Sequence, residues 1–168
     1  VITLLQLNGV LVKRITQDTT IEVEYYHIDD YKSVPKAYEK HHFNYNIKLT
    51  AKTDTIHFLK GDYIVYAGQK ADRYIVETLE PLGDDSFFHW NFFDAILQQK
   101  EGYSDYRWED VAAQYLQQHP DIKQQLEEKK KSDTTLAASA KVQLDFVYKN
   151  SPYYEPAYLR YPVYRLMK

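Results

Sequence analysis

The chain has 168 residues, no cysteine and a formal net charge of −3. This length suits one domain, or one domain with a small appendage, and it can bury a sizeable core. The charge argues against a nucleic-acid partner, the lack of cysteine excludes a disulfide framework and a thiolate zinc site, and no apolar run is long enough to span a membrane.

The first part of the chain carries the alternation typical of half-buried strands. Leu4, Leu5 and Leu7 predict a short helix, which Gly9 can end in the left-handed conformation. From Thr20 to Ile28, apolar and polar residues alternate, which predicts a strand with one buried face. The same pattern predicts strands over 10–15, 45–51, 55–59 and 63–66, with loops over 29–40 and 52–54. Residues 1–67 are therefore expected to be mainly β, in a small antiparallel sheet.

Helical spacing replaces this alternation after Gly68, so that residues 68–150 are expected to be mainly helical. Pro120 suits the first position of a helix, and Asp133 can cap the last one. Apolar residues at helical spacing predict helices over 71–79, 93–100, 108–116, 120–126 and 133–147. After the tail begins at residue 151, residues 161–166 predict a strand that returns to the sheet edge, where Pro162 is tolerated.

The predicted fold class is therefore α+β: an N-terminal antiparallel sheet packs against a C-terminal helical half, and a final strand returns to the sheet. Five large aromatic residues lie within residues 84–94, which is more than an exposed helix carries. We expect Trp90, Phe93 and Trp108 to be mostly buried where the helices meet the sheet.

Three candidate reactive constellations have structural alternatives. Ser86 and His89 near two aspartates suggest a hydrolase triad, but Ser86 lacks the glycines of a nucleophile elbow and can instead cap the following segment. His41 and His42 beside Glu39 suggest a metal site, although adjacent histidines rarely share one ion. A glycosidase pair among Asp85, Asp94, Glu101 and Asp105 is opposed by a structural polar network. No catalytic residue, metal ligand or cofactor is assigned.

Tyrosine is the compositional outlier, with 17 residues. Its ring packs while its hydroxyl stays hydrogen-bonded, which suits a contact surface, although a core built from tyrosine explains the excess equally well. In the tail over 151–168, tyrosines interleave with prolines. This pattern favours an extended strap laid over a surface, with a sugar or peptide platform as the alternative. The chain also opens at Val1 inside an apolar run, which is typical of a fragment cut from a longer polypeptide.

Several motifs follow one another in an order that resembles a known family. The most specific are the aromatic block Asp85-Ser86-Phe87-Phe88-His89-Trp90-Asn91-Phe92-Phe93-Asp94 and the tail Ser151-Pro152-Tyr153-Tyr154-Glu155-Pro156, followed by Arg160-Tyr161-Pro162-Val163-Tyr164-Arg165-Leu166. The chain resembles the region that follows the catalytic domain in bacterial zinc carboxypeptidase-like proteins of the carboxypeptidase A superfamily, of the type found in Bacteroides relatives.

This resemblance implies a parent protein with an upstream metallopeptidase domain, in which zinc polarises the carbonyl and activates water. The family's His-x-x-Glu zinc motif is absent here, so zinc is expected only upstream and the chain is expected to be one non-catalytic accessory domain, 1–168. The resemblance also suggests a periplasmic or exported protein. The residues expected to contact the upstream domain are Leu4, Leu5, Leu7, Tyr153, Tyr154, Tyr158, Tyr161 and Tyr164.

Two other functions stay open at this point. The chain could be a peptide- or glycan-binding module attached to an exported enzyme, in which case its aromatic residues should line a concave pocket. It could also be an enzyme with an unfamiliar site. A flat apolar surface would instead favour the accessory domain.

Overall fold

The computed structural model describes residues 1–99 and 102–167. The backbone divides into two compact units: Val1–Gln98 with Ala157–Lys168, and Gln99–Pro156. We call them the sheet unit and the helical unit. The sheet unit contains two antiparallel sheets, and the described helices α3 to α6 belong to the helical unit. The α+β prediction is therefore confirmed.

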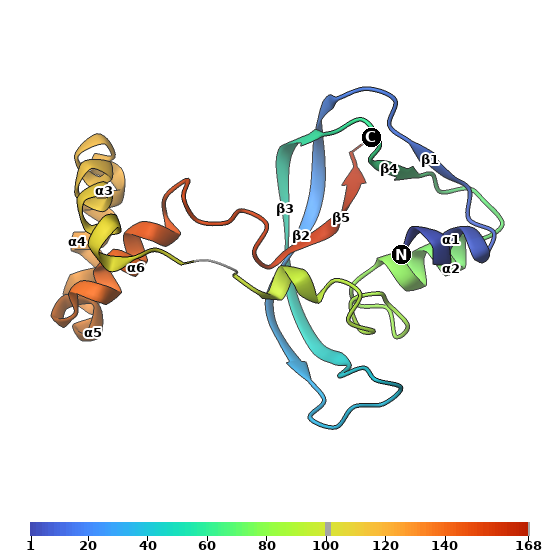
Figure 1. Ribbon diagram of the computed structural model, residues 1–168, viewed down its shortest axis with the longest axis horizontal. Coiled ribbons are helices and arrows are strands. Elements are labelled where there is room, and N and C mark those ends of the chain that lie inside the picture. Colours follow the sequence, from blue (N-terminus) through green and yellow to red (C-terminus); the bar gives the residue numbers. More distant parts are fainter. Residues whose placement is uncertain (100–101, 168) are drawn as a thin grey trace. The chain divides into compact units, whose positions relative to one another are not determined.

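The larger sheet has the strand order β3-β2-β5, with β2 (Thr19–Ser33) in the centre, β3 (Asn44–Phe58) on one side and β5 (Arg160–Leu166) on the other (Figure 1). The predicted return of the last strand is confirmed. Pro162 lies in this edge strand, where the register between β2 and β5 shifts, so its missing N–H interrupts no regular ladder.

The predicted loops of the β2–β3 hairpin are wrong in position. β3 continues through residues 52–54, where Asp54 pairs with Val23 and Lys52 with Tyr25. β2 extends to Ser33, and Asp29 accepts a hydrogen bond from Thr50 Oγ1 at 2.6 Å across the hairpin. Backbone pairing between β2 and β3 therefore continues the strands through residues whose polarity alone predicted loops. The turn itself spans 34–43, with Glu39 and Lys40 at positive φ.

A smaller sheet pairs β1 (Val12–Arg14) with β4 (Tyr63–Val65). Two helices, α1 (Ile2–Leu7) and α2 (Asp72–Leu79), share a core with it around Leu5, Val10 and Phe87. Gly9 has a φ of 79° directly after α1, as predicted. Because α2 packs in this core, the compact sheet unit extends past the predicted β-to-α boundary at residue 67.

A second core in the sheet unit forms around Ile28, Phe88 and Tyr161. The predicted helix over 93–100 is instead a single 3-10 turn, η1 (Asp94–Leu97); the end of that prediction, residue 100, lies outside the described residues. Tyr161 is 1% exposed and meets the rings of Phe88 and Phe93 edge-on. Its hydroxyl donates to the Leu79 carbonyl oxygen at 2.8 Å, which joins β5 to the end of α2.

Burial raises the pKa of the Tyr161 hydroxyl above its ordinary value of 10.0, and Glu80 adds to the effect. A raised folded-state pKa stabilises the fold below the unfolded pKa, and this contribution is lost as the pH rises above about 10. We expect the free energy of unfolding of the sheet unit to fall from about pH 10 upward. Urea titrations between pH 8 and 11 should show it. Tyr161→Phe should flatten that slope, and an unchanged slope would contradict the assignment.

The helical unit consists of α3 (Asp105–Gln118), α4 (Pro120–Ser132), α5 (Thr134–Ala138) and α6 (Ala140–Lys149). Pro120 begins α4 as predicted, and the Asp133 carboxylate accepts the N–H groups of Thr135 and Leu136, which confirms the predicted cap. The predicted last helix is broken after Ala138. There Ser139 begins α6 and accepts the N–H of Val142, because serine favours a capping geometry over a helix interior.

Helices α3 to α6 bury their apolar faces against one another. Trp108 is 4% exposed, touches Tyr103 and Tyr148, and donates from Nε1 to the Leu144 carbonyl oxygen at 3.1 Å. All these partners belong to the helical unit. The prediction that Trp108 lies between helices and sheet is therefore wrong, because the helical unit has a core of its own.

The helical unit is inserted into the sheet unit. The N–H of Leu159 donates to the carbonyl oxygen of Ile96 at 2.8 Å. The chain thus leaves the sheet unit after η1 and re-enters it at a neighbouring point, directly before β5.

Candidate functional site

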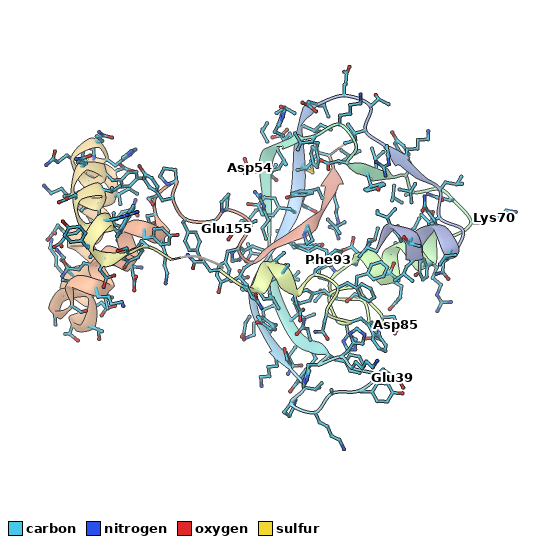
Figure 2. The ribbon with its side chains drawn as sticks, viewed as in Figure 1. Glu39, Asp54, Lys70, Asp85, Phe93 and Glu155 are labelled. Carbon is cyan, nitrogen blue, oxygen red and sulfur yellow. The ribbon has the colours of Figure 1, made fainter. Side chains whose placement is uncertain are left out.

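The aromatic block at residues 84–94 packs on the turn end of the β2–β3 hairpin. Phe87 and Phe88 are 4% and 0% exposed, each in one of the two cores of the sheet unit. Figure 2 shows Asp85 and Glu39 at this end of the unit, and Phe93 beside η1. Trp90 and Phe93 keep only a minor part of their surface exposed, which agrees with their predicted burial, and Phe93 packs on both cores of the sheet unit.

Asn44 is the polar centre of this junction, with 1% exposure. Its Nδ2 donates to the Phe88 carbonyl oxygen at 3.1 Å and to Asp94 Oδ1 at 2.9 Å, while its Oδ1 accepts from Ser33 Oγ at 2.7 Å. Its backbone N–H donates to the His89 carbonyl oxygen, and its own carbonyl oxygen accepts from His89 Nδ1 at 2.9 Å. Asn44 therefore connects the aromatic block to β3 through both its side chain and its backbone.

Asn91 makes a second connection. It has a φ of 66°, a left-handed conformation that asparagine tolerates better than most residues. Its Nδ2 donates to the His42 carbonyl oxygen at 2.9 Å. The buried Oδ1 of Asn91 finds no hydrogen-bond partner among the described residues. The turn at Asn91 thus directs the following residue, Phe92, outward.

A cluster of rings covers the outside of this junction. Phe43 lies 4.7 Å from His89 and 4.5 Å from Trp90, and His41 lies 5.5 Å from Trp90 and 6.1 Å from Phe92, as ring-centroid distances. Tyr38 and Phe92 are 62% and 46% exposed. We call Tyr38, His41, Phe43, Trp90 and Phe92 the hairpin aromatic surface. The sequence indicated the aromatic block, but it gave no sign that the hairpin turn supplies three of the five rings of this surface.

The candidate triad residues have structural hydrogen bonds. Ser86 is completely buried and its Oγ accepts from the His89 N–H at 3.0 Å, so it caps the turn as the structural alternative predicted. His89 is bonded to Asn44, and Asp85 accepts from Trp90 Nε1 at 3.2 Å. These contacts leave no exposed hydroxyl beside a free base, which a nucleophilic triad requires.

The candidate glycosidase carboxylates are divided between the two units. Asp94 is bonded to Asn44 in the sheet unit, whereas Asp105 lies at the start of α3 in the helical unit. Glu101 lies outside the described residues. Of the candidate metal residues, His42 donates from Nδ1 to the Val34 carbonyl oxygen. Within residues 1–99 and 102–167, no three His, Asp or Glu side chains are grouped as a metal site requires.

The tyrosine-rich tail is divided between the two units, with residues 151–156 in the helical unit and the part from Ala157 in the sheet unit. Tyr153, 59% exposed, meets the Trp108 ring, and Tyr154 packs against the core of the helical unit. In the sheet unit, Tyr161 is buried, and Tyr164 packs on Phe58 and Tyr25. Tyr158 is half-buried. The predicted interface role is therefore wrong for the Tyr161 side chain, which fills the protein's own core.

Of the three leucines of α1, one is buried, one is partly buried and one is exposed. Leu5 is 1% exposed and belongs to the core, so its predicted contact with a partner is also wrong. Leu4 is half-buried and packs on the same core. Leu7, by contrast, is 77% exposed.

Two further apolar residues of the sheet unit are also exposed. Leu11 is 74% exposed and follows the turn after α1, and Tyr66, 51% exposed, comes directly after Val65, the partner of Val12. The Gln69 side chain holds these segments together, since it accepts from the Leu11 N–H and donates to the Tyr66 carbonyl oxygen, both at 2.7 Å. We call Leu7, Leu11 and Tyr66 the α1–β4 apolar surface. Sequence reasoning missed Leu11 and Tyr66, because it placed both in ordinary half-buried strands.

An open groove of about 470 Å³ lies in the helical unit. Lys129 Nζ lies 5.1 Å above the Phe146 ring there. The groove is formed by the C-terminal parts of α4 and α6, and its lining residues are Gln125, Glu128, Lys129, Ser132, Phe146, Lys149 and Asn150. Both charge signs line it, so its electrostatics select no ligand class.

Comparisons with protein-family models, with curated proteins and with solved structures found no match to this chain. No described helix is long and apolar enough to cross a membrane.

Proposed function

We propose that this chain is a non-catalytic accessory domain that packs on an upstream zinc carboxypeptidase-like domain of the same polypeptide and stabilises or shapes it. The observation that carries the proposal is the α1–β4 apolar surface: Leu7 at the end of α1 is 77% exposed, and Leu11 and Tyr66, whose segments Gln69 joins, are 74% and 51% exposed. Exposed apolar groups near one another are typical of contacts between domains.

Two further observations support a role by contact. The polar side chains that could have formed a reactive site, Ser86, His89 and Asp94, hold the aromatic block on β3 instead. The aromatic block and the tail, which resemble the region after the catalytic domain in carboxypeptidase-like proteins, supply cores for the two units. The zinc chemistry of the proposed parent would then belong to the upstream domain alone.

The test is to express the upstream domain and this chain separately and to measure their association by calorimetry. Leu7→Lys with Leu11→Lys should weaken the association at least about tenfold, since burying two charges in an apolar contact costs more than 1.4 kcal/mol. Leu82→Lys is the matched control, because Leu82 is 62% exposed but lies in the turn after α2. No measurable association of the unaltered chain, or equal weakening by the control, would refute the accessory-domain proposal.

The hairpin aromatic surface favours a second candidate function, a peptide- or glycan-binding module. Exposed rings such as Tyr38 and Phe92 offer flat apolar faces for stacking. If the two domains do not associate but Phe92→Ala abolishes retention on cell-wall peptide or glycan, this candidate replaces the first.

A further inference from the structure

The outer edge of β3 is open. Among the described strands, β3 pairs only with β2 in the order β3-β2-β5 (Figure 1). β3 runs for 15 residues, Asn44–Phe58. In an antiparallel ladder, alternate residues direct their N–H and C=O groups to opposite sides. Every second residue of β3 therefore turns a backbone donor and acceptor away from the sheet.

The two edges of this sheet differ in their protection. β5 has 7 residues, contains Pro162 and pairs with β2 only between Val23 and His27. β3 contains neither proline nor glycine. Sheets usually block a long edge with proline, a bulge or a covering segment, because an open edge pairs readily with another strand. β3 has an irregularity of its own only at its hairpin end, where its register with β2 shifts and Asn46 has a φ of 51°. Residues 49–58 have no such protection.

We infer that β3 pairs antiparallel with β3 of a second copy of this chain, with the two Ala51 residues opposite each other on the two-fold axis. Ala51 is the middle residue of Asn44–Phe58, so this register overlaps the two strands over their full length, and it pairs Lys48 to Asp54 with one another where β3 is regular. It places Lys48 of each copy opposite Asp54 of the other, and the symmetry makes that pair twice. The small Ala51 side chain suits the close approach at the axis. Three strands from each copy then form one continuous sheet.

Neighbouring registers lose this complementarity. A two-fold centre at Thr50 sets Lys48 against Lys52, and a centre at Lys52 sets Lys52 against itself and Asp54 against Thr50. A centre at Thr53 pairs Lys52 with Asp54 but leaves residues 44–47 unpaired. Opposite charges facing each other across strands are favourable, and like charges are unfavourable, by about 0.2–1 kcal/mol per pair. Charge and overlap together favour the register centred on Ala51, and a register centred on Thr53 is the nearest competitor, because residues 44–47, which it leaves unpaired, contain the irregular part of β3.

Lys48 and Asp54 can turn to a second copy, because their contacts within one copy are exposed. Lys48 Nζ lies 3.1 Å from Asp30 Oδ2, and their side chains are 74% and 55% exposed. Asp54 Oδ1 accepts the N–H of its neighbour Thr55 at 2.7 Å, also at the surface; Figure 2 labels Asp54 on β3. Exposed contacts of this kind contribute little, so their rearrangement opposes pairing only weakly. The pairing uses a different surface from the α1–β4 apolar surface and does not depend on the proposed function.

Sedimentation velocity of the 168-residue chain should show a concentration-dependent dimer. Asp54→Lys should weaken dimerisation roughly tenfold, because it creates two like-charge pairs. Adding Lys48→Asp to it should restore the dimer. Glu22→Lys is the matched control: it makes the same charge change on β2, opposite Thr55, and should leave dimerisation unchanged. A monomer at roughly 1 mM, where even weak contacts form, or no rescue by the double change, overturns the inference.

The absence of cysteine in the chain allows a direct test of the register. Ala51→Cys should form an intermolecular disulfide under mild oxidation, since this register sets the two thiols directly opposite each other, with Cβ atoms about 4.5–5.5 Å apart, at the upper limit of what a disulfide bridges. Thr53→Cys should cross-link much more slowly, because the register places it opposite Leu49. Faster cross-linking at position 53 than at position 51 would overturn the register.

Discussion

Replacement of Trp108 by alanine should unfold the helical unit and leave the sheet unit folded. Trp108 is 4% exposed and contacts Tyr103, Tyr148 and Tyr153 around the core of the helical unit. A buried tryptophan-to-alanine change costs about 3–5 kcal/mol. A unit of 58 residues, from Gln99 to Pro156, has a total stability of only about 3–9 kcal/mol. The change therefore removes between about a third and all of the stability of the helical unit.

Amide hydrogen exchange measures the two units separately in the same sample. In the Trp108→Ala variant, protection should be lost across α3 to α6 and retained in β2 and β3. Tyr106→Ala is the matched control, because Tyr106 lies on the same helix and is 88% exposed. Loss of protection in both units together would contradict the independence of the two cores.

Replacement of Asn44 by alanine should detach the aromatic block from the hairpin. The change leaves the Phe88 carbonyl oxygen, the Asp94 carboxylate and the Ser33 hydroxyl without their buried partner. An unsatisfied buried polar group costs about 1–3 kcal/mol, so we expect a loss of about 2–5 kcal/mol in the sheet unit. The melting temperature should fall by roughly 10–20 °C.

Differential scanning calorimetry with hydrogen exchange over residues 84–94 checks this expectation. Thr53→Ala is the control on the same strand, since Thr53 is exposed. Asn44→Asp offers a second test, because it brings a carboxylate beside Asp94 in place of the Nδ2 that lies 2.9 Å away. Two carboxylates at this distance share a proton more readily at low pH, so the Asp variant should be relatively more stable at pH 4 than at pH 7. Equal stability of the Asn44→Ala variant and the Thr53 control would show that the hydrogen bonds around Asn44 contribute little.

Local patterns predicted most of the secondary structure for physical reasons that apply within a few residues. The alternation from Thr20 to Ile28 and the helical spacing around Trp108 and Ala112 depend only on which face is buried. Pro120 at the start of α4 and the Asp133 cap depend on local hydrogen bonds. These predictions were confirmed.

The errors occurred where a distant partner decides the structure. Lys52 to Asp54 look like a turn alone, but their partners on β2, Val23 to Tyr25, extend the ladder through them. Trp108 and Trp90 look alike in sequence, yet one fills the helical core and the other lies half-buried beside Phe43. The role of Asn44 depends on contacts with residues 88, 89 and 94, more than 40 positions away along the chain. No periodicity records such contacts.

The hydrogen bond between Leu159 and Ile96 has a consequence for the order in which the protein folds during synthesis. β5 follows the whole helical unit in the chain, and it supplies Tyr161 to the core of the sheet unit. A ribosome therefore releases a complete helical unit before the sheet unit has its third strand. Domains generally fold as units, in the order of their completion. We therefore expect the helical unit to complete its fold first, while the nascent sheet unit lacks the Tyr161 ring against Phe88 until β5 is synthesised.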